Sequence, residues 1–323
     1  MKFKYILLLI LLLIFYYLFF NRKKEHFSFS KLTSDFYGNY GIIYINNSRR
    51  FGNFILILKN SIKLGIFYNL RGIKIINKNS SLIDINTYYN FGCNKLYDLK
   101  ILDNLKIINN YGIRNRCFYY EKCMKNIFPD LDFDKVSDKT MNKILKEIIY
   151  KNYNFKIKPS DYNLCIHIRS GDIFKKFPHP GYMQPPYDFY KKIIESNKYN
   201  KILIISEDRK NPNINKILKN YPFIDFKIND LKTDIEMILN TPNICCGTGT
   251  FVTEILSLSY GSKQLIKFEK DYIQKLYYNN GLIIKQSNKI QLKNYISEWN
   301  YTEEQLNMML NFKLDNIDDV IYF

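Results

Sequence analysis

The second half of the chain alternates strand-like and helix-like segments, and this alternation constrains the fold more than any other feature. Short apolar runs predict strands at 163–168, 202–205, 223–228, 244–246 and 264–266. Helical segments are expected between them, at about 187–197, 212–219, 231–239 and 251–259. Strands joined by helices of this length pair in parallel, and helices cover both faces of the sheet. The sequence therefore predicts an α/β fold with a parallel sheet.

The first half is expected to contain one strand–helix–strand unit, with its elements at 41–46, 54–70 and 72–76. A short connection over 49–53, with the sequence RRFGN, leads into the helix. The stretch 80–135 shows no period and is expected to be irregular. A helix is predicted over 141–151, and its apolar face is formed by Ile144, Leu145, Ile148 and Ile149.

The loop at 152–161 is the expected boundary between two bodies. We predict an N-terminal α/β domain over 38–158 and a C-terminal domain over 159–285. The remainder, 286–323, contains the only tryptophan, Trp299, and is expected to be a helical extension that packs back onto the protein.

The N-terminus carries an unbroken apolar run over residues 5–20, with basic residues on both sides. Sixteen residues is short for a membrane span but suits a thin membrane. A cleaved signal peptide is the rival interpretation, and it lacks the usual small-residue cleavage site. We expect a cytoplasmic head and retained signal anchor over 1–24 and a stem over 25–37. The protein would then be a single-pass type II membrane protein of the endoplasmic reticulum or Golgi.

The net charge of +18 is weaker evidence for an anionic partner than it looks. The chain has 40 Lys but only 8 Arg, together with 38 Asn, and all the lysine and asparagine codons are AT-rich. No nucleic-acid-binding module is recognisable either. We therefore expect no nucleic-acid partner, although a basic membrane-surface or nucleic-acid binder is kept as an alternative.

Five of the six cysteines fall into two groups. In an oxidising compartment, Cys117 and Cys123 could close a small loop. Cys165, Cys245 and Cys246 lie in apolar strand-like runs and are expected to be buried thiols.

Three polar clusters follow strands of the predicted C-terminal sheet. They are His167–Asp172 (HIRSGD), Ser206–Asp208 (SED) and Gly247–Thr250 (GTGT). Each could be structural: a core histidine, a helix cap and a turn. Together they are expected at one sheet edge, where open parallel sheets bind ligands. Arg169 and the backbone N–H groups of the GTGT segment are suited to an anion such as a diphosphate.

The sequence DLDFD at 130–134 indicates a different chemistry, because alternating aspartates can hold a divalent metal on a nucleotide-sugar diphosphate. A solvated acidic loop explains the same residues more simply. We therefore predict no metal site, and a metal-dependent transferase remains the competing hypothesis.

Four motifs resemble the fucosyltransferase superfamily, which includes the α1,2-, α1,6- and O-fucosyltransferases. CIHIRSGD resembles the H-x-R-R-x-D signature, and RRFGNFILILKNSIKLGIFYNLRGIKI looks like the Gly-Asn turn, helix and strand that open the α1,2 enzymes. ILIISED is similar to the second motif, and DIEMILNTPNICCGTGT to the third. The four matches occur in family order over about residues 39–260.

This resemblance implies a GT-B-type glycosyltransferase with two Rossmann-like domains and no cofactor, whose C-terminal domain binds GDP-fucose as donor. Arg169 would hold the diphosphate, with Thr250 on the same group and Thr248 in the same loop. The remaining donor residues would be His167 and Asp234 at the guanosine and Glu207 and Asp208 lining the cleft.

The implied reaction is a metal-independent, inverting transfer of the sugar to a hydroxyl of a glycan or glycoprotein acceptor. An acceptor hydroxyl needs a base, and Asp172 is the carboxylate nearest to Arg169 in the sequence, although it could equally be a structural cap. Ser170 stands where most of the superfamily has a second arginine. Two alternatives follow from this departure: a transferase that uses another nucleotide sugar, and a non-catalytic nucleotide- or glycan-binding relative.

Overall fold

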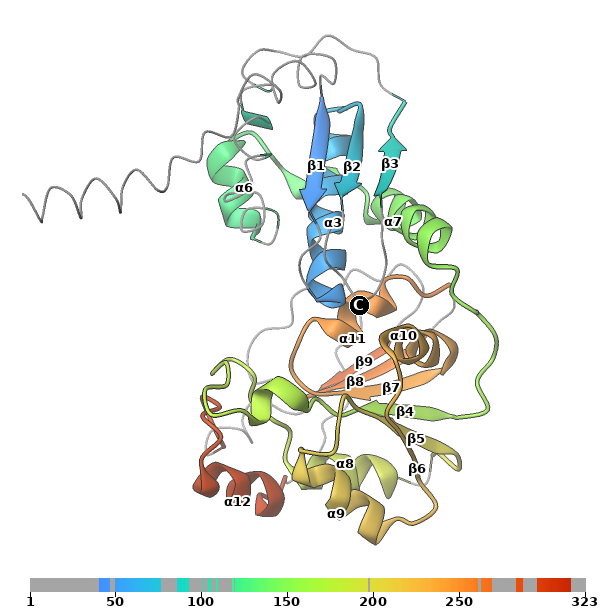
Figure 1. Cartoon of the computed structure of the whole chain (residues 1–323), viewed down its shortest axis with the longest axis vertical. Coiled ribbons are helices and arrows are strands. Elements are labelled where there is room, and N and C mark those ends of the chain that lie inside the picture. Colours follow the sequence, from blue (N-terminus) through green and yellow to red (C-terminus); the bar gives the residue numbers. More distant parts are fainter. Residues whose placement is uncertain are drawn as a thin grey trace, which may run out of the picture.

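The computed structural model shows two lobes, each built around a β-sheet (Figure 1). It describes residues 41–46, 50–76, 86–92, 101, 104–105, 109, 118, 120–196, 198–260, 263–268, 283–286 and 295–314. The expected anchor and stem lie outside these residues. Within the described part of the chain, no helix is both long enough and apolar enough to span a membrane.

The upper lobe contains the predicted strand–helix–strand unit. Strands β1 (Ile42–Asn46) and β2 (Gly72–Ile76) pair in parallel, and helix α3 (Phe51–Phe67) connects them. The helix begins earlier than expected, so Gly52 and Asn53 lie in its first turn rather than in a connection. Strand β3 (Asn86–Asn90) adds an antiparallel edge to the sheet, in a stretch that we expected to be irregular.

Two further helices of this lobe are described along their full length. Helix α7 (Asp138–Tyr153) contains the predicted segment and buries Leu145, Ile148 and Ile149, which confirms its apolar face. Helix α6 (Glu121–Ile127) was not predicted, since it buries only Met124 and so carries no apolar period. A short 3₁₀ turn, η1 (Phe133–Lys135), precedes α7.

The lower lobe is a six-stranded parallel sheet in the order β6-β5-β4-β7-β8-β9. All five predicted strands are confirmed, namely β4 (Leu164–His167), β5 (Ile202–Ile205), β6 (Asp225–Lys227), β7 (Asn243–Cys246) and β8 (Gln264–Lys267). The four predicted helices are also present, as α8 (Tyr187–Ile194), α9 (Pro212–Asn220), α10 (Leu231–Asn240) and α11 (Phe251–Leu256). Strand β9 (Ile283–Gln286) extends the sheet beyond the strands that we predicted.

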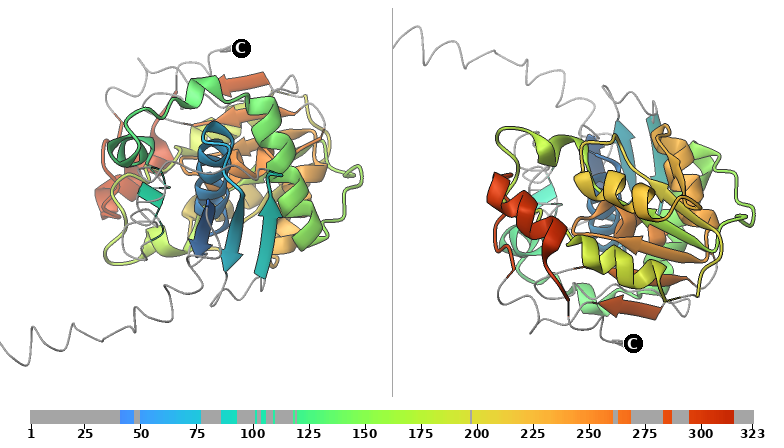
Figure 2. Two further views of the ribbon diagram at one scale, coloured as in Figure 1. Left: turned by 90° about the horizontal axis from the view of Figure 1, so that it is seen from above. Right: turned by 90° about the horizontal axis from the view of Figure 1, so that it is seen from below.

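The four strands β4, β5, β7 and β8 are buried on both faces, with successive residues of each strand on opposite faces. Cys165, Leu203 and Ile244 belong to the apolar core that continues into the upper lobe. Leu164 and Ile202 belong to a second core beneath the sheet. Accordingly, α10 and α11 lie between the sheet and the upper lobe, while α8 and α9 cover the far face (Figures 1 and 2).

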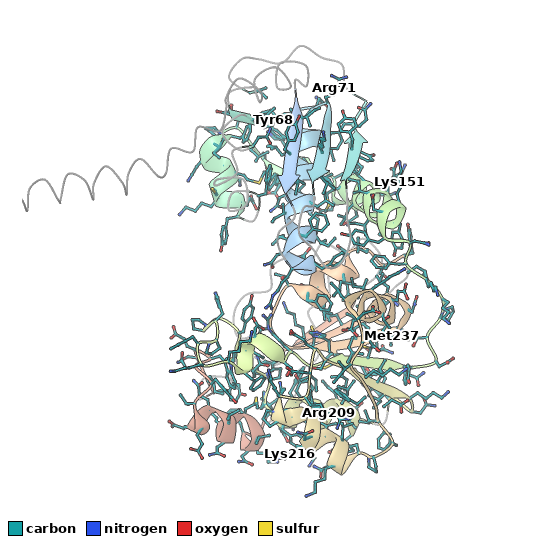
Figure 3. The ribbon with its side chains drawn as sticks, viewed as in Figure 1. Tyr68, Arg71, Lys151, Arg209, Lys216 and Met237 are labelled. Carbon is teal, nitrogen blue, oxygen red and sulfur yellow. The ribbon has the colours of Figure 1, made fainter. Side chains whose placement is uncertain are left out.

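The C-terminal segment packs back onto the lower lobe, as predicted. Trp299 is fully buried, and its indole Nε1–H donates to the backbone oxygen of Ile173 at 2.7 Å. Among the residues of this segment that the structure describes, those of α12 (Glu303–Asn311) are helical. Lys216 of α9, labelled in Figure 3, donates to the backbone oxygen of Leu310 at 2.7 Å and so ties α9 to the end of α12.

The two lobes meet along α3 and α11. Gly52 is required at this contact, because an added Cβ would lie 2.8 Å from the Cα of Phe251. Lys59 of α3 forms an ion pair with Glu254 of α11 at 3.0 Å, and both side chains are largely buried. The interface is therefore closely packed and charge-paired.

Two cysteine predictions can be compared with the structure. Cys165, Cys245 and Cys246 are buried thiols, as expected. Cys123 is disulfide-bonded. Cys117, which we expected to close a loop with Cys123, lies outside the described residues.

Candidate functional site

The three polar clusters follow neighbouring strands of the lower sheet. His167, the last residue of β4, is aligned with Ile205 at the end of β5 and with Cys246 at the end of β7. The segments that follow these strands therefore leave the sheet at one edge. This is the edge at which open parallel sheets bind ligands.

Arg169 is held from three sides at this edge. Its guanidinium carbon lies 3.6 Å from the centre of the Tyr182 ring, and its Nη2 lies 3.4 Å from both carboxylate oxygens of Asp172. Gly249 lies against its Nη1, since a Cβ added there would be only 3.1 Å away. Nε of Arg169 is buried and has no hydrogen-bond partner among the described residues.

Asp172 links Arg169 to the upper lobe. It lies in the short 3₁₀ helix η2 (Gly171–Phe174) and forms a second ion pair, at 3.0 Å, with Nη2 of Arg50. Partial burial raises the pKa of Asp172, but the hydrogen bond from Arg50 and the charge of Arg169 outweigh burial and leave the pKa below its usual value. Asp172 is thus a carboxylate bound by two guanidinium groups, which suits a positioning residue better than a base. We call Arg50, Arg169 and Asp172 the arginine cluster.

Asp208 and Glu207 hold the turn that follows Arg169. The carboxylate of Asp208 accepts hydrogen bonds from the Ser170 hydroxyl and from the Gly171 N–H, the latter at 3.3 Å. Gly171 has a left-handed backbone (φ +65°), and a Cβ there would lie 2.3 Å from a carboxylate oxygen of Glu207. Both acidic residues therefore lie beside the arginine cluster, where Asp208 is used to shape the turn.

His167 and Asp234 lie on the sheet face that carries α10 and α11. The His167 ring is 5.1 Å from the ring of Phe251, and burial followed by the charge of Arg169 lowers its pKa to about 4. His167 is therefore neutral at physiological pH. Asp234, in the first turn of α10, accepts a hydrogen bond from Asn229 at 3.0 Å, and burial raises its pKa to about 6. No hydrogen bond or ion pair joins Asp234 to the arginine cluster within the described residues.

The hydroxyl groups of the GTGT segment have protein partners. Thr250 donates to the side-chain oxygen of Asn53 at 2.9 Å, across the lobe interface. Thr248 donates to the backbone oxygen of Phe268 at 3.4 Å. In this structure Thr250 connects the two lobes, and Gly249 is the residue of the segment that adjoins Arg169.

Three residues of the site were not predicted as site residues: Arg50, Asn53 and Tyr182. Arg50 and Asn53 belong to the RRFGN motif that carried part of the resemblance, so a signal was available for them. Tyr182 lies in the segment PHPGYMQPP, for which no role was predicted. Its stacking on Arg169 depends on a loop conformation that no local pattern predicts.

In the DLDFD segment, the side chain of Asp132 makes contacts with neighbouring residues. Asp132 accepts a hydrogen bond from the N–H of Asp134 at 3.1 Å and pairs with Lys135 at 3.7 Å. Among the described residues, no three or more His, Cys, Asp or Glu side chains form a group that could hold a metal ion.

Comparison with known proteins gives similarities of overall structure alone. No family model matches the chain, and no curated protein matches it. The E. coli heptosyltransferase WaaC with ADP-2-deoxy-2-fluoro heptose is similar with a TM-score of 0.45 and 8% identity, over 82% of this chain and 99% of WaaC. A glycosyl transferase of family 9 from Veillonella parvula has a TM-score of 0.42 and 9% identity, over 77% of this chain and 86% of its own. Likenesses this weak assign neither a family nor a function to this chain.

Proposed function

We propose that this chain is a glycosyltransferase that takes its sugar from a nucleoside diphosphate sugar, with the donor diphosphate beside Arg169 at the edge of the lower sheet. The proposal rests on the contacts that hold the guanidinium group of Arg169 in place. Its guanidinium group is fixed by Tyr182 and Asp172, lies against the backbone of Gly249, and keeps a buried Nε without a partner among the described residues. A fixed, planar cation at a sheet edge is suited to bind an anion with two oxygens.

The chemistry of transfer explains why such a cation is needed. When the bond between the sugar and the diphosphate breaks, negative charge develops on the departing phosphate oxygen. Hydrogen-bond donors that are already in place stabilise this charge without having to reorganise. Gly249 has no side chain, so a phosphate can approach the backbone of the GTGT segment next to Arg169.

Arg50 supplies a second guanidinium group beside the site, although position 170, where most of the fucosyltransferase superfamily has a second arginine, is a serine. Its guanidinium group lies on the same carboxylate as Arg169, so a second cation adjoins the site from the upper lobe. With two arginines and one aspartate, the arginine cluster has a net charge of +1. In this proposal Arg169 is the catalytic residue, and Asp172 positions both arginines.

The donor that we propose is GDP-fucose. The carboxylate of Asp234 accepts one hydrogen bond from Asn229, which leaves acceptor capacity for the N1–H and amino group of guanine. A neutral His167 on the same face supplies one donor and one acceptor. From the sequence alone, we further propose a glycan or glycoprotein acceptor and a type II membrane anchor at residues 5–20.

Turnover of a panel of nucleotide sugars tests the proposal. The purified protein is incubated with GDP-, UDP- and ADP-sugars, and release of the nucleoside diphosphate is measured for wild type, Arg169→Ala and Arg169→Lys. We expect GDP-fucose to be turned over, Arg169→Ala to lose about 10²–10³ in rate, and Arg169→Lys to recover little, because lysine lacks the planar fork. Binding of GDP without turnover of any sugar would indicate the non-catalytic relative instead.

A further inference from the structure

The loop Lys175–Gly181, which we call the Phe177 loop, begins and ends at the arginine cluster. Asp172, three residues before it, pairs with Arg169, and Tyr182, the residue after it, stacks on the same guanidinium group. The loop lies on the α12 side of the lower lobe (Figures 1 and 2). The residues on both sides of the loop therefore adjoin the proposed donor site.

The loop is held in a defined conformation by the C-terminal segment. The backbone N–H of Trp299 donates to the oxygen of Pro180 at 2.9 Å, and its indole donates to Ile173 at 2.7 Å. Within the loop, the N–H of Gly181 donates to Nδ1 of His179 at 3.1 Å. The side chains on the loop are thus presented from an ordered backbone.

Phe177 is unusually exposed for an aromatic side chain. Phe177 is 85% exposed, the largest value among the exposed large apolar residues of the described chain. The side chains of Lys175, Lys176 and His179 are also exposed, and the Lys176 amine lies 5.5 Å from the Phe177 ring. Among the described residues, neither lysine forms an ion pair. The loop therefore presents an aromatic ring and two amines together, from an ordered backbone, beside the arginine cluster.

We propose that the Phe177 loop binds the acceptor, and that the acceptor is a saccharide carrying acidic groups. This inference rests on the proposed function, since transfer requires the acceptor hydroxyl to lie close to the departing diphosphate. The ring of Phe177 offers an apolar face for the C–H face of a pyranose. Lys175 and Lys176 supply charges that are complementary to a carboxylate or sulfate on the same saccharide.

Binding of defined saccharides to the full chain, without donor, tests this inference. The probes are a sulfated heparin-derived hexasaccharide, a carboxylated oligogalacturonide hexamer and neutral cellohexaose, at an ionic strength of about 0.15 M. We expect at least one acidic probe to bind more tightly than cellohexaose. Phe177→Ala and the Lys175→Ala/Lys176→Ala double variant should each weaken that binding by about tenfold or more.

Matched controls separate the loop from the general positive charge of the chain. Phe223, in the connection between α9 and β6, is 60% exposed, and Lys219, in the last turn of α9, is exposed too. Phe223→Ala and Lys219→Ala should leave the affinity unchanged within about twofold. GDP affinity, measured on all variants, should also be unchanged, because neither loop substitution touches the arginine cluster.

Three outcomes overturn the inference: no probe binds the wild type, the loop variants bind as the wild type does, or the control variants lose as much affinity as the loop variants. Loss of binding to phosphatidylserine vesicles in the loop variants, with saccharide affinity kept, would assign the loop to a membrane surface instead. A chain that binds saccharides through the loop but turns over no nucleotide sugar would refute the proposed function and leave the saccharide site standing.

Discussion

Arg50 and Asp172 belong to opposite lobes, and their side chains meet at 3.0 Å beside Arg169. Arg50 precedes the first residue of α3, whereas Asp172 lies in η2, which begins four residues after His167 at the end of β4. Because Asp172 also pairs with Arg169, the ion pair joins the proposed diphosphate site to the upper lobe.

Removing Arg50 should impair transfer more than folding. Its side chain is 62% exposed, so Arg50→Ala should leave the melting temperature nearly unchanged. If Arg50 shares the charge of the departing diphosphate, kcat should fall by about 10–10². Arg71, an exposed arginine of the same lobe labelled in Figure 3, provides the control, and Arg71→Ala should keep full activity. A normal kcat in Arg50→Ala would show that Arg50 does not stabilise the charge of the departing diphosphate, which would leave this role to Arg169.

Tyr182 should position Arg169 through its ring and not through its hydroxyl group. Tyr182→Phe keeps the stacking partner and is expected to retain wild-type kcat/KM. Tyr182→Leu removes the ring, and loss of a partly desolvated cation–π contact of about 1–2 kcal/mol predicts a fall of about 5- to 30-fold. Steady-state kinetics of both variants decide the question, and equal loss in both would point to the hydroxyl group instead.

The pKa of Asp234 predicts opposite pH effects on stability and on nucleotide binding. Burial raises this pKa to about 6 in the folded protein, from 3.8 in the unfolded chain, so the folded state favours the protonated form. Asp234 therefore contributes stability that is complete below pH 4 and is lost as the pH rises through about 6, a change of about 2–3 kcal/mol.

Binding of guanine would need the ionised form, so GDP affinity should rise over the same pH range. Denaturant unfolding and GDP titrations between pH 4 and pH 8 measure both effects, and Asp234→Asn should remove both. An Asp234→Asn variant that binds GDP normally would show that Asp234 only supports the start of α10.

Transfer should not require a divalent metal. The arginine cluster supplies positive charge at the site, and Asp132 is used to cap η1 and to pair with Lys135. Activity is therefore expected to survive excess chelator, and an Asp130→Ala/Asp132→Ala variant should stay active with a small loss of stability from the missing cap. A chelated enzyme that is inactive and recovers with added Mn²⁺ would favour the metal-dependent mechanism.

The lower sheet was predictable because its signals are local. Strands β4, β5, β7 and β8 each contain a short apolar run, the helices between the predicted strands have apolar faces, and β5 matches its predicted bounds. Strand β3 and helix α6 of the upper lobe were not predicted, because they lack such signals. Strand β3, with the sequence NTYYN, has little apolar character, and α6 buries a single side chain. Their positions are set by contacts with the rest of the upper lobe.

The site was predictable as a location and less so as a set of contacts. Strand ends indicated that His167, Asp208 and the GTGT segment would come together at one edge. The stacking of Tyr182 and the ion pair of Arg50 depend on loop and lobe packing, which spacing along the chain does not encode. For the same reason the sequence suggested Asp172 as a base, whereas its two arginine partners give it another role.

The close approach of Gly52 to Phe251 offers a means of recognising distant relatives. A side chain at position 52 would collide with the backbone at the start of α11, so any chain that keeps this lobe arrangement must keep a glycine in the first turn of the helix after its first strand. The neighbouring Asn53 and Thr250 add a second paired constraint through their hydrogen bond. Such chains can be identified by searching for two features together. The first is Gly-Asn at the start of the first helix, and the second is a threonine followed by an aromatic residue after the fourth strand of a later parallel sheet. This search applies where overall sequence similarity is low.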